Sequence, residues 1–119
     1  HAGRAIVLRF DLCDFFPSVT RARIVALLLT AGYPEPVALR LAGICTARVP
    51  RTVLAQCPEP LTPAEVWHRN RRYSLPHLPQ GAPTSPALAN LAAHSLDRRL
   101  AGLAATVHAS YTRYADDLV

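Results

Sequence analysis

The last nine residues, 111–119, constrain the fold more than any other stretch of this chain. Their order is Tyr-Thr-Arg-Tyr-Ala-Asp-Asp-Leu-Val, in which β-favouring residues lead into a tight polar turn and then into an apolar return. Two adjacent carboxylates, Asp116 and Asp117, lie in the predicted turn, and neighbouring side chains on a hairpin point in different directions. Acids at the lip of a sheet suit a hard divalent cation, although most such pairs are solvated turn residues.

The composition is that of at most one globular domain. The chain has 119 residues, half of them hydrophobic, and it contains no apolar run long enough to span a bilayer and no signal-peptide pattern. It begins at His1 rather than Met and ends just after the acidic pair, so we expect a segment cut from a larger protein. We expect that protein to be cytoplasmic and without a membrane partner.

The basic residues point to a polyanionic partner without requiring one. The formal net charge is +5 and all 13 basic residues are Arg, whose guanidinium binds phosphate in a bidentate manner. A soluble basic domain with no such partner fits the charge equally well.

Cysteine and histidine show no metal-site spacing. The chain has an odd number of cysteines, Cys13, Cys45 and Cys57, and they form no C-x-x-C pair. The five histidines do not lie at metal-ligand spacing from them. We expect buried or inert thiols in a reducing compartment, and no zinc site.

The N-terminal part predicts a strand that carries another acid. Residues 5–13 alternate, with one face formed by Ile6, Leu8 and Phe10 and the other by Val7, Arg9 and Asp11. Asp11 therefore falls near the end of the strand, where its side chain can emerge into a cleft. Asp14 follows, and Pro17 is expected to break the chain direction.

Two helices are predicted next, both for core packing. The first is capped by Ser18 or Thr20, carries Ile24, Leu27 and Leu28, and ends at Gly32. The second begins at residues 34–36 and is expected to bury one stripe, formed by Val37, Leu41, Ile44 and Cys45.

Residues 49–78 lose this periodicity and are interrupted by prolines. Aromatic and basic residues alternate in part of this stretch, at Trp67, His68, Arg69, Arg71, Arg72 and Tyr73. Such a cluster can follow a nucleic-acid backbone with stacking support. A solvated variable loop is the favoured interpretation, because nothing in the sequence restrains its geometry.

Residues 78–86, Leu-Pro-Gln-Gly-Ala-Pro-Thr-Ser-Pro, predict a stiff loop that opens a helix. Gly81 is the one permissive residue between prolines, and Thr84 or Ser85 is placed to cap a helix with Pro86 in its first turn. The loop either directs backbone N–H groups and Gln80 toward a phosphate ligand or is simply a rigid helix entry. The helix is expected to bury one face, formed by Leu88, Leu91, Ala92, Leu96, Leu100 and Leu103.

If the first and last strands are neighbours in one sheet, Asp11 and Asp116 can share a divalent ion with Asp117 alongside. Carboxylates that hold two Mg²⁺ ions can activate a hydroxyl and stabilise the leaving group in phosphoryl transfer. No nucleophilic side chain is then needed, since the nucleic acid supplies the hydroxyl.

These residues resemble the palm motifs of reverse transcriptases. Residues 10–19 (Phe-Asp-Leu-Cys-Asp-Phe-Phe-Pro-Ser-Val), residues 78–86 and the Tyr-Ala-Asp-Asp of residues 114–117 occur in the order and rough spacing of three family motifs. Gln-Gly-Ala-Pro-Thr-Ser-Pro and Tyr-Thr-Arg-Tyr-Ala-Asp-Asp are similar to the bacterial retron type. The resemblance covers nearly the whole chain apart from residues 49–77.

The resemblance implies an α+β polymerase palm, a small antiparallel sheet backed by helices, spanning residues 1–119 with 49–78 as a variable loop. It implies Asp11 and Asp116 as the main Mg²⁺ ligands, with Asp117 weaker, the Leu12 carbonyl as a further oxygen and Mn²⁺ able to substitute. Phe16 matches the residue that excludes a 2′-hydroxyl, and Gln80 and Gly81 match the nucleotide-pocket loop. Arg113 is assigned no role and is treated as a surface strand residue.

The implied activity is RNA-templated addition of deoxynucleotides to a primer. Retron enzymes copy a structured non-coding RNA into msDNA, can prime from an internal 2′-hydroxyl, and act in anti-phage defence with an effector protein. Part of the fingers and the thumb are missing, so we expect the 119-residue piece alone to be inactive, marginally folded and prone to aggregate at an unpaired sheet edge. The alternatives are a group II intron or other prokaryotic reverse transcriptase, and a non-catalytic nucleic-acid-binding relic of the palm.

Overall fold

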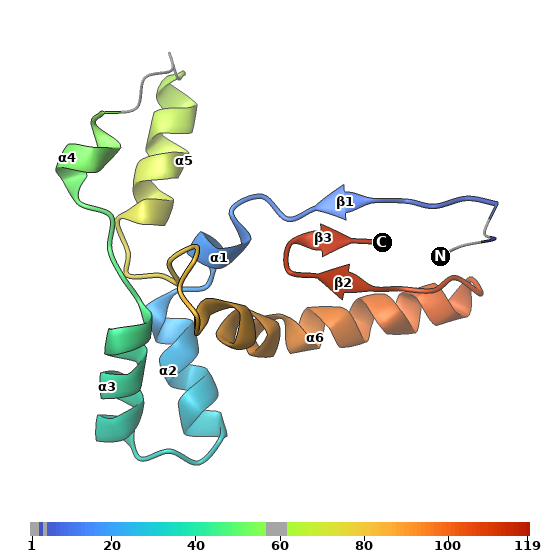
Figure 1. Ribbon diagram of the computed structural model, residues 1–119, viewed down its shortest axis with the longest axis horizontal. Coiled ribbons are helices and arrows are strands. Elements are labelled where there is room, and N and C mark those ends of the chain that lie inside the picture. Colours follow the sequence, from blue (N-terminus) through green and yellow to red (C-terminus); the bar gives the residue numbers. More distant parts are fainter. Residues whose placement is uncertain (1–2, 4, 57–61) are drawn as a thin grey trace.

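The structure is a computed structural model that describes residue 3, residues 5–56 and residues 62–119. The described elements, in chain order, are β1 (Phe10–Asp11), α1 (Phe15–Ser18), α2 (Arg21–Thr30), α3 (Glu35–Cys45), α4 (Arg51–Leu54), α5 (Pro63–Tyr73), α6 (Ser85–Thr106), β2 (Arg113–Tyr114) and β3 (Asp117–Leu118) (Figure 1). The expected mixture of helices with a small antiparallel sheet is confirmed. The predictions for Cys57 and its neighbours through residue 61 lie outside the described residues.

The sheet is small, and its central strand is the last one in the chain. β3 pairs antiparallel with β1 on one side and with β2 on the other. The ladder between β2 and β3 extends by one pair, since Thr112 and Val119 exchange N–H···O bonds of 2.8 and 2.9 Å. The predicted strand over residues 5–13 is realised only at Phe10–Asp11, because β3 offers no further partner beside residues 5–9 among the described residues.

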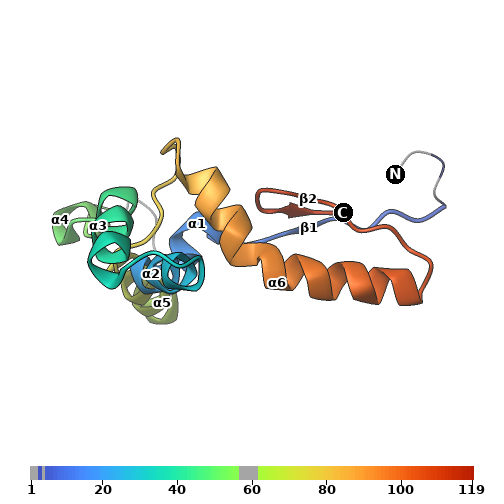
Figure 2. The same ribbon diagram turned by 90° about the horizontal axis from the view of Figure 1, so that it is seen from below.

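The core lies at the junction of α1, α2, α3 and the first half of α6. Its buried members are Phe15, Val19, Ile24, Ala42, Leu78, Ala89, Ala92 and Ala93. The sheet runs alongside the second half of α6, away from this core (Figure 2). Ile6, Leu8 and Phe10 therefore remain 78%, 64% and 60% exposed.

The expected break at Pro17 is wrong. Residues Phe15–Ser18 form the one-turn helix α1, with Pro17 buried inside it. Proline is tolerated there because the N–H groups of a first helical turn have no intrahelical acceptor to lose. The turn begins at Asp14, whose backbone is left-handed at φ 52°.

The starts of α2 and α3 agree with expectation, but the predicted stripe on α3 is wrong for Val37 and Ile44, whereas Leu41 and Cys45 are half-buried. α2 ends at Thr30, and Gly32 follows with φ 90°. On α3 the buried residues are Ala38 and Ala42, whereas Val37 and Ile44 are 41% and 82% exposed. The small alanines let α3 approach α2 closely, so the helix turns its smaller side chains inward.

α6 shows the same preference for small residues at the core. Thr84 occupies the N-cap position and Pro86 lies in the first turn, as predicted, although the Thr84 side chain makes no capping hydrogen bond. The buried residues are Ser85, Ala89, Ala92 and Ala93. The predicted buried face is wrong for Leu91, Leu96 and Leu103, which are 60%, 36% and 63% exposed.

The stretch 49–78 is not a loop throughout, which corrects the favoured interpretation. It contains α4 and α5, and the two are joined by an Arg69 Nη2 hydrogen bond of 2.9 Å to the Leu54 carbonyl. A capping box between Thr62 and Glu65 starts α5. The two ends of this stretch, which we call the excursion over residues 49–78, lie side by side, because Ala47 and His77 exchange backbone hydrogen bonds of 2.9 and 3.0 Å.

The helices of the described residues include none with the length and apolar character that a bilayer crossing requires.

Candidate active site

The sheet places Asp11 directly opposite Asp117. The two residues are register partners across β1 and β3, so both side chains lie on the same face of the sheet. Two unpaired carboxylates in that position would repel each other. Arg9 relieves this repulsion, because its Nε and Nη2 atoms donate hydrogen bonds of 2.9–3.1 Å to the Asp117 carboxylate.

The Arg9 pairing sets the character of Asp117. The hydrogen bonds from Arg9 lower the pKa of Asp117, so the carboxylate is charged and already engaged. Arg9 itself is 71% exposed, and an ion pair in such contact with water adds little to stability. A pair of this kind leaves Asp117 able to exchange partners.

Asp116 occupies the turn between β2 and β3, and its position corrects one detail of the sequence analysis. The turn residues are Ala115 and Asp116, whereas Asp117 is the first residue of β3. Ala115 has a left-handed backbone with φ 53°. The Asp116 carbonyl accepts a 2.9 Å hydrogen bond from the Leu12 N–H, which fastens the turn to the residue after β1.

The donors around this turn suit a hard cation. Among the described residues, the carboxylates of Asp11 and Asp116 make no hydrogen bond or ion pair, so their oxygens are available. No group of three or more His, Cys, Asp or Glu side chains among the described residues is close enough together to hold a metal ion by itself. Mg²⁺ commonly binds one or two carboxylates and completes its coordination with water and substrate phosphate, so this sparse donor set fits it.

Phe16 lies on α1 beside the first strand. Its ring is half-buried and packs at 5.5 Å from the Phe15 ring, tilted by 59°. Phe15 is 8% exposed and belongs to the core, so it holds the short helix in place. The same short segment thus presents Asp11, Leu12 and Phe16 in a fixed relation.

The loop before α6 is closed by a buried serine. Ser85 is fully buried, and its Oγ donates a 2.6 Å hydrogen bond to the Pro79 carbonyl. Leu78, also fully buried, donates its N–H to the Val19 carbonyl at 3.1 Å. Gly81 has φ 88°, which confirms the need for a permissive residue between the prolines. Gln80 and Gly81 are exposed at the tip.

Arg113 is the residue that sequence reasoning missed, and its assignment to the surface is wrong. Its side chain is 6% exposed. Nε and Nη2 donate bonds of 2.8 and 2.6 Å to the Asp97 carboxylate on α6, and Nη1 donates to Asn90 Oδ1 at 3.0 Å and to the Ala115 carbonyl at 2.8 Å. One signal in the sequence was available: Arg113 follows Tyr111 by two residues, so both side chains lie on the same face of the strand and can reach the same partner.

Asp97 is held ionised by this network. The hydrogen bonds from Arg113 lower its pKa, burial acts in the opposite direction, and a 2.8 Å bond from the Tyr111 hydroxyl adds to the lowering. The ion pair is therefore complete at neutral pH. It joins the strand that precedes the acidic turn to the middle of α6.

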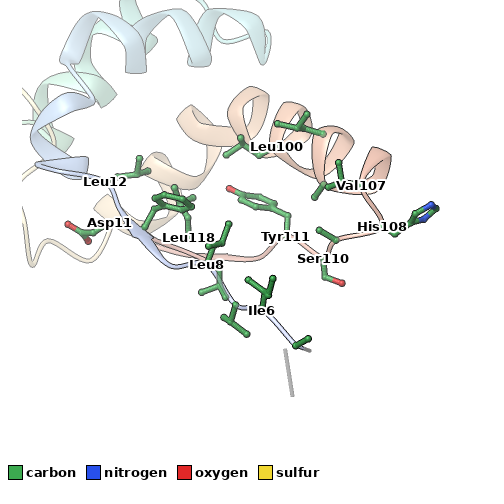
Figure 3. A pocket seen from close by; sticks show the side chains of 17 residues that line it. Ile6, Leu8, Asp11, Leu12, Leu100, Val107, His108, Ser110, Tyr111 and Leu118 are labelled. Carbon is green, nitrogen blue, oxygen red and sulfur yellow. The ribbon is translucent and has the colours of Figure 1, made fainter. Parts of the chain in front are cut away.

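A mostly apolar cavity of about 790 Å³ lies beside Asp11, between the sheet and the second half of α6 (Figure 3). Asp11 and Leu12 line one end, and Ile6, Leu100 and Val107 are among the residues that line the remainder. The lining is mostly apolar, which does not suit a phosphate-bearing ligand.

Two cysteines lie among the described residues. Cys13 is exposed and Cys45 is half-buried, and both are free thiols.

The comparisons agree with the motifs. The model of a family described as reverse transcriptase (RNA-dependent DNA polymerase) matches residues 1–119. The chain is 47% identical to the retron Mx65 reverse transcriptase of Myxococcus xanthus, over 99% of this chain and 26% of that protein. It is 40% identical to the retron Mx162 reverse transcriptase of the same organism and 36% identical to the retron Ec86 reverse transcriptase of Escherichia coli, and spans 22% and 28% of their lengths.

Proposed function

The chain belongs to the reverse transcriptase family, and on that premise we propose that it is the palm segment of a retron-type RNA-directed DNA polymerase. The resemblance drawn from the three motifs is confirmed, since the three relatives named above are retron enzymes. The chain spans about a quarter of their length, and the activity proposed here is that of the full-length protein.

One observation carries the proposal. Residues more than a hundred positions apart in sequence, in β1 and β3, are hydrogen-bonded neighbours, and Asp11 lies opposite Asp117, the residue that follows Asp116. A pure nucleic-acid binder gains nothing from acids gathered on the surface that meets phosphate, because they repel the backbone. A metal-dependent phosphoryl transferase needs them.

The proposed roles follow the geometry of each residue. Asp11 and Asp116 are the principal metal ligands because their carboxylates make no hydrogen bond or ion pair among the described residues, and Asp117 is the weaker ligand because Arg9 engages it. The Leu12 carbonyl is a further candidate oxygen donor. When bound, two Mg²⁺ ions, or Mn²⁺ in their place, supply charge stabilisation for the attacking and leaving oxygens.

The remaining residues shape the nucleotide pocket. Phe16, backed by the core residue Phe15, is proposed to stand against the sugar and exclude a 2′-hydroxyl. Gln80 and Gly81, exposed at the tip of a loop that Ser85 closes, are proposed to contact the incoming deoxynucleotide. The proposed partners are an RNA template with its primer, a structured non-coding RNA and, by similarity to retrons, an effector protein in anti-phage defence.

Substitution of the acids in the full-length protein tests this function. Asp116→Asn keeps the size and shape of the side chain but removes its charge, so it should abolish templated deoxynucleotide incorporation while RNA binding is retained. Asp117→Asn is the matched control and should cause a smaller loss. Unchanged synthesis by Asp116→Asn would exclude the proposed metal site, whereas RNA binding without any templated synthesis by the wild type would favour the non-catalytic alternative.

A further inference from the structure

Arg113 connects all three motif segments, although none of the motif roles includes it. Its guanidinium lies 5.3 Å from the Phe15 ring in the first segment and bonds to Asn90 and Asp97 on the helix that the second segment opens. In the third segment it bonds to the Ala115 carbonyl. A side chain that is 6% exposed and makes four hydrogen bonds is held in one orientation.

The bond to Ala115 acts on Asp116 through the backbone. The Ala115 carbonyl and the Asp116 nitrogen belong to one planar peptide unit, so fixing the carbonyl fixes the start of Asp116. Ala115 holds a left-handed conformation that is unfavourable for alanine, and such a conformation persists only where surrounding contacts impose it. Nη1 of Arg113 provides that contact.

The peptide on the other side of Asp116 is fixed as well. The Asp116 carbonyl accepts the Leu12 N–H, so both peptide units that flank this residue are restrained. Asp97 forms the ion pair with Arg113, so the guanidinium does not pair with the Asp116 carboxylate. Arg9 behaves in the opposite way, because it binds Asp117 directly.

We propose that Arg113, held by Asp97, is a positioning residue that orients the Asp116 carboxylate for metal binding. This inference rests on the function proposed above. Arg113 touches neither the metal site nor the nucleotide; it acts through the Ala115–Asp116 peptide. Lysine cannot replace it, because an ammonium group lacks the planar fork that reaches Asp97 and Ala115 together.

The test compares Arg113→Lys with two further variants of the full-length protein. Misplacement of a catalytic group by about 1 Å can lower the rate by about a hundredfold, so Arg113→Lys should lower kcat by at least about tenfold. It should also raise the Mg²⁺ concentration needed for half-maximal synthesis, with RNA binding retained. Asp97→Asn, which loosens the fork without removing the guanidinium, should show the same two changes more weakly.

Arg23→Lys is the matched control. Arg23 Nη2 donates a 2.7 Å bond to the Ala92 carbonyl, so this variant breaks an arginine bond to α6 that includes no residue of the turn. It should leave both kcat and the Mg²⁺ dependence unchanged. Thermal unfolding of each variant identifies any that does not fold, and Asp97→Asn carries the test if Arg113→Lys is one of them.

The outcomes separate the two proposals. If Arg113→Lys and Asp97→Asn lower the melting temperature but keep the wild-type kcat and Mg²⁺ dependence, Arg113 is merely structural and this inference is wrong. If Asp116→Asn itself remains active, the proposed function fails first.

Discussion

The hydroxyl of Tyr73 donates a 2.8 Å hydrogen bond to Oδ1 of Asp14, 59 positions earlier in the chain. Arg72 binds the other carboxylate oxygen at 2.5 Å. Asp14 is the residue that starts α1, and Tyr73 ends α5, so the excursion over residues 49–78 is fastened to the segment that carries Asp11 and Phe16. Burial and the bond to Asp14 raise the pKa of Tyr73 to about 12.

Removing the Tyr73 hydroxyl should therefore release α5. Tyr73→Phe deletes one hydrogen bond to a charged acceptor, and we expect the free energy of unfolding to fall by about 1–2 kcal/mol. Urea denaturation of the full-length protein measures the change, and amide hydrogen exchange should show faster exchange in α5. The control is Tyr33→Phe at an exposed position. Equal exchange in Tyr73→Phe and the wild type would mean that other contacts hold α5.

Acid should weaken the structure through Asp97. Its pKa lies below the ordinary value of 3.8 because Arg113 binds it, so the unfolded chain takes up a proton more readily than the folded one. The stabilisation is complete above the unfolded value and is lost as the pH falls through the folded value. The urea midpoint should drop more steeply below about pH 4 in the wild type than in Asp97→Asn. Parallel curves for the two proteins would contradict the assignment.

Phe16 should control the choice of sugar. Phe16→Ala removes the ring proposed to exclude a 2′-hydroxyl, and we expect the ratio of ribonucleotide to deoxynucleotide incorporation to rise by about tenfold or more. Single-nucleotide incorporation kinetics measure the ratio for each substrate. Phe16→Tyr, which keeps the ring, should retain the wild-type preference. A preference that is the same in Phe16→Ala would place sugar selection elsewhere.

Much of the site was predictable because its signals are local. The end of a β-patterned strand placed Asp11, and the strand–turn–strand pattern placed Asp116. The sequence left open whether the two strands are neighbours, and the pairing of β1 with β3 answers this. The sequence placed Asp117 in the turn, whereas the turn consists of Ala115 and Asp116. This was missed because alanine rarely adopts the left-handed conformation that Ala115 has.

The errors arose where contacts between distant residues decide the outcome. Counting large apolar residues put Val37 and Ile44 inside, whereas helix packing selected Ala38 and Ala42. The many prolines and arginines led to the prediction of a loop where α5 forms, although the capping box of Thr62 and Glu65 in the sequence indicates the start of a helix. Alternation could place Arg113 on a strand face but could not show that Asp97 lies opposite it.

The central claim is that Asp11 and Asp116 bind one catalytic metal site together, and direct metal binding tests it without reference to activity. Electron paramagnetic resonance of Mn²⁺ would be recorded with the full-length protein, an RNA template, a primer and a non-hydrolysable deoxynucleotide. We predict that the wild type shows bound Mn²⁺ and that Asp11→Asn and Asp116→Asn each lose most of it, while Asp97→Asn retains it more fully. Full Mn²⁺ binding by both Asp11→Asn and Asp116→Asn would contradict the account.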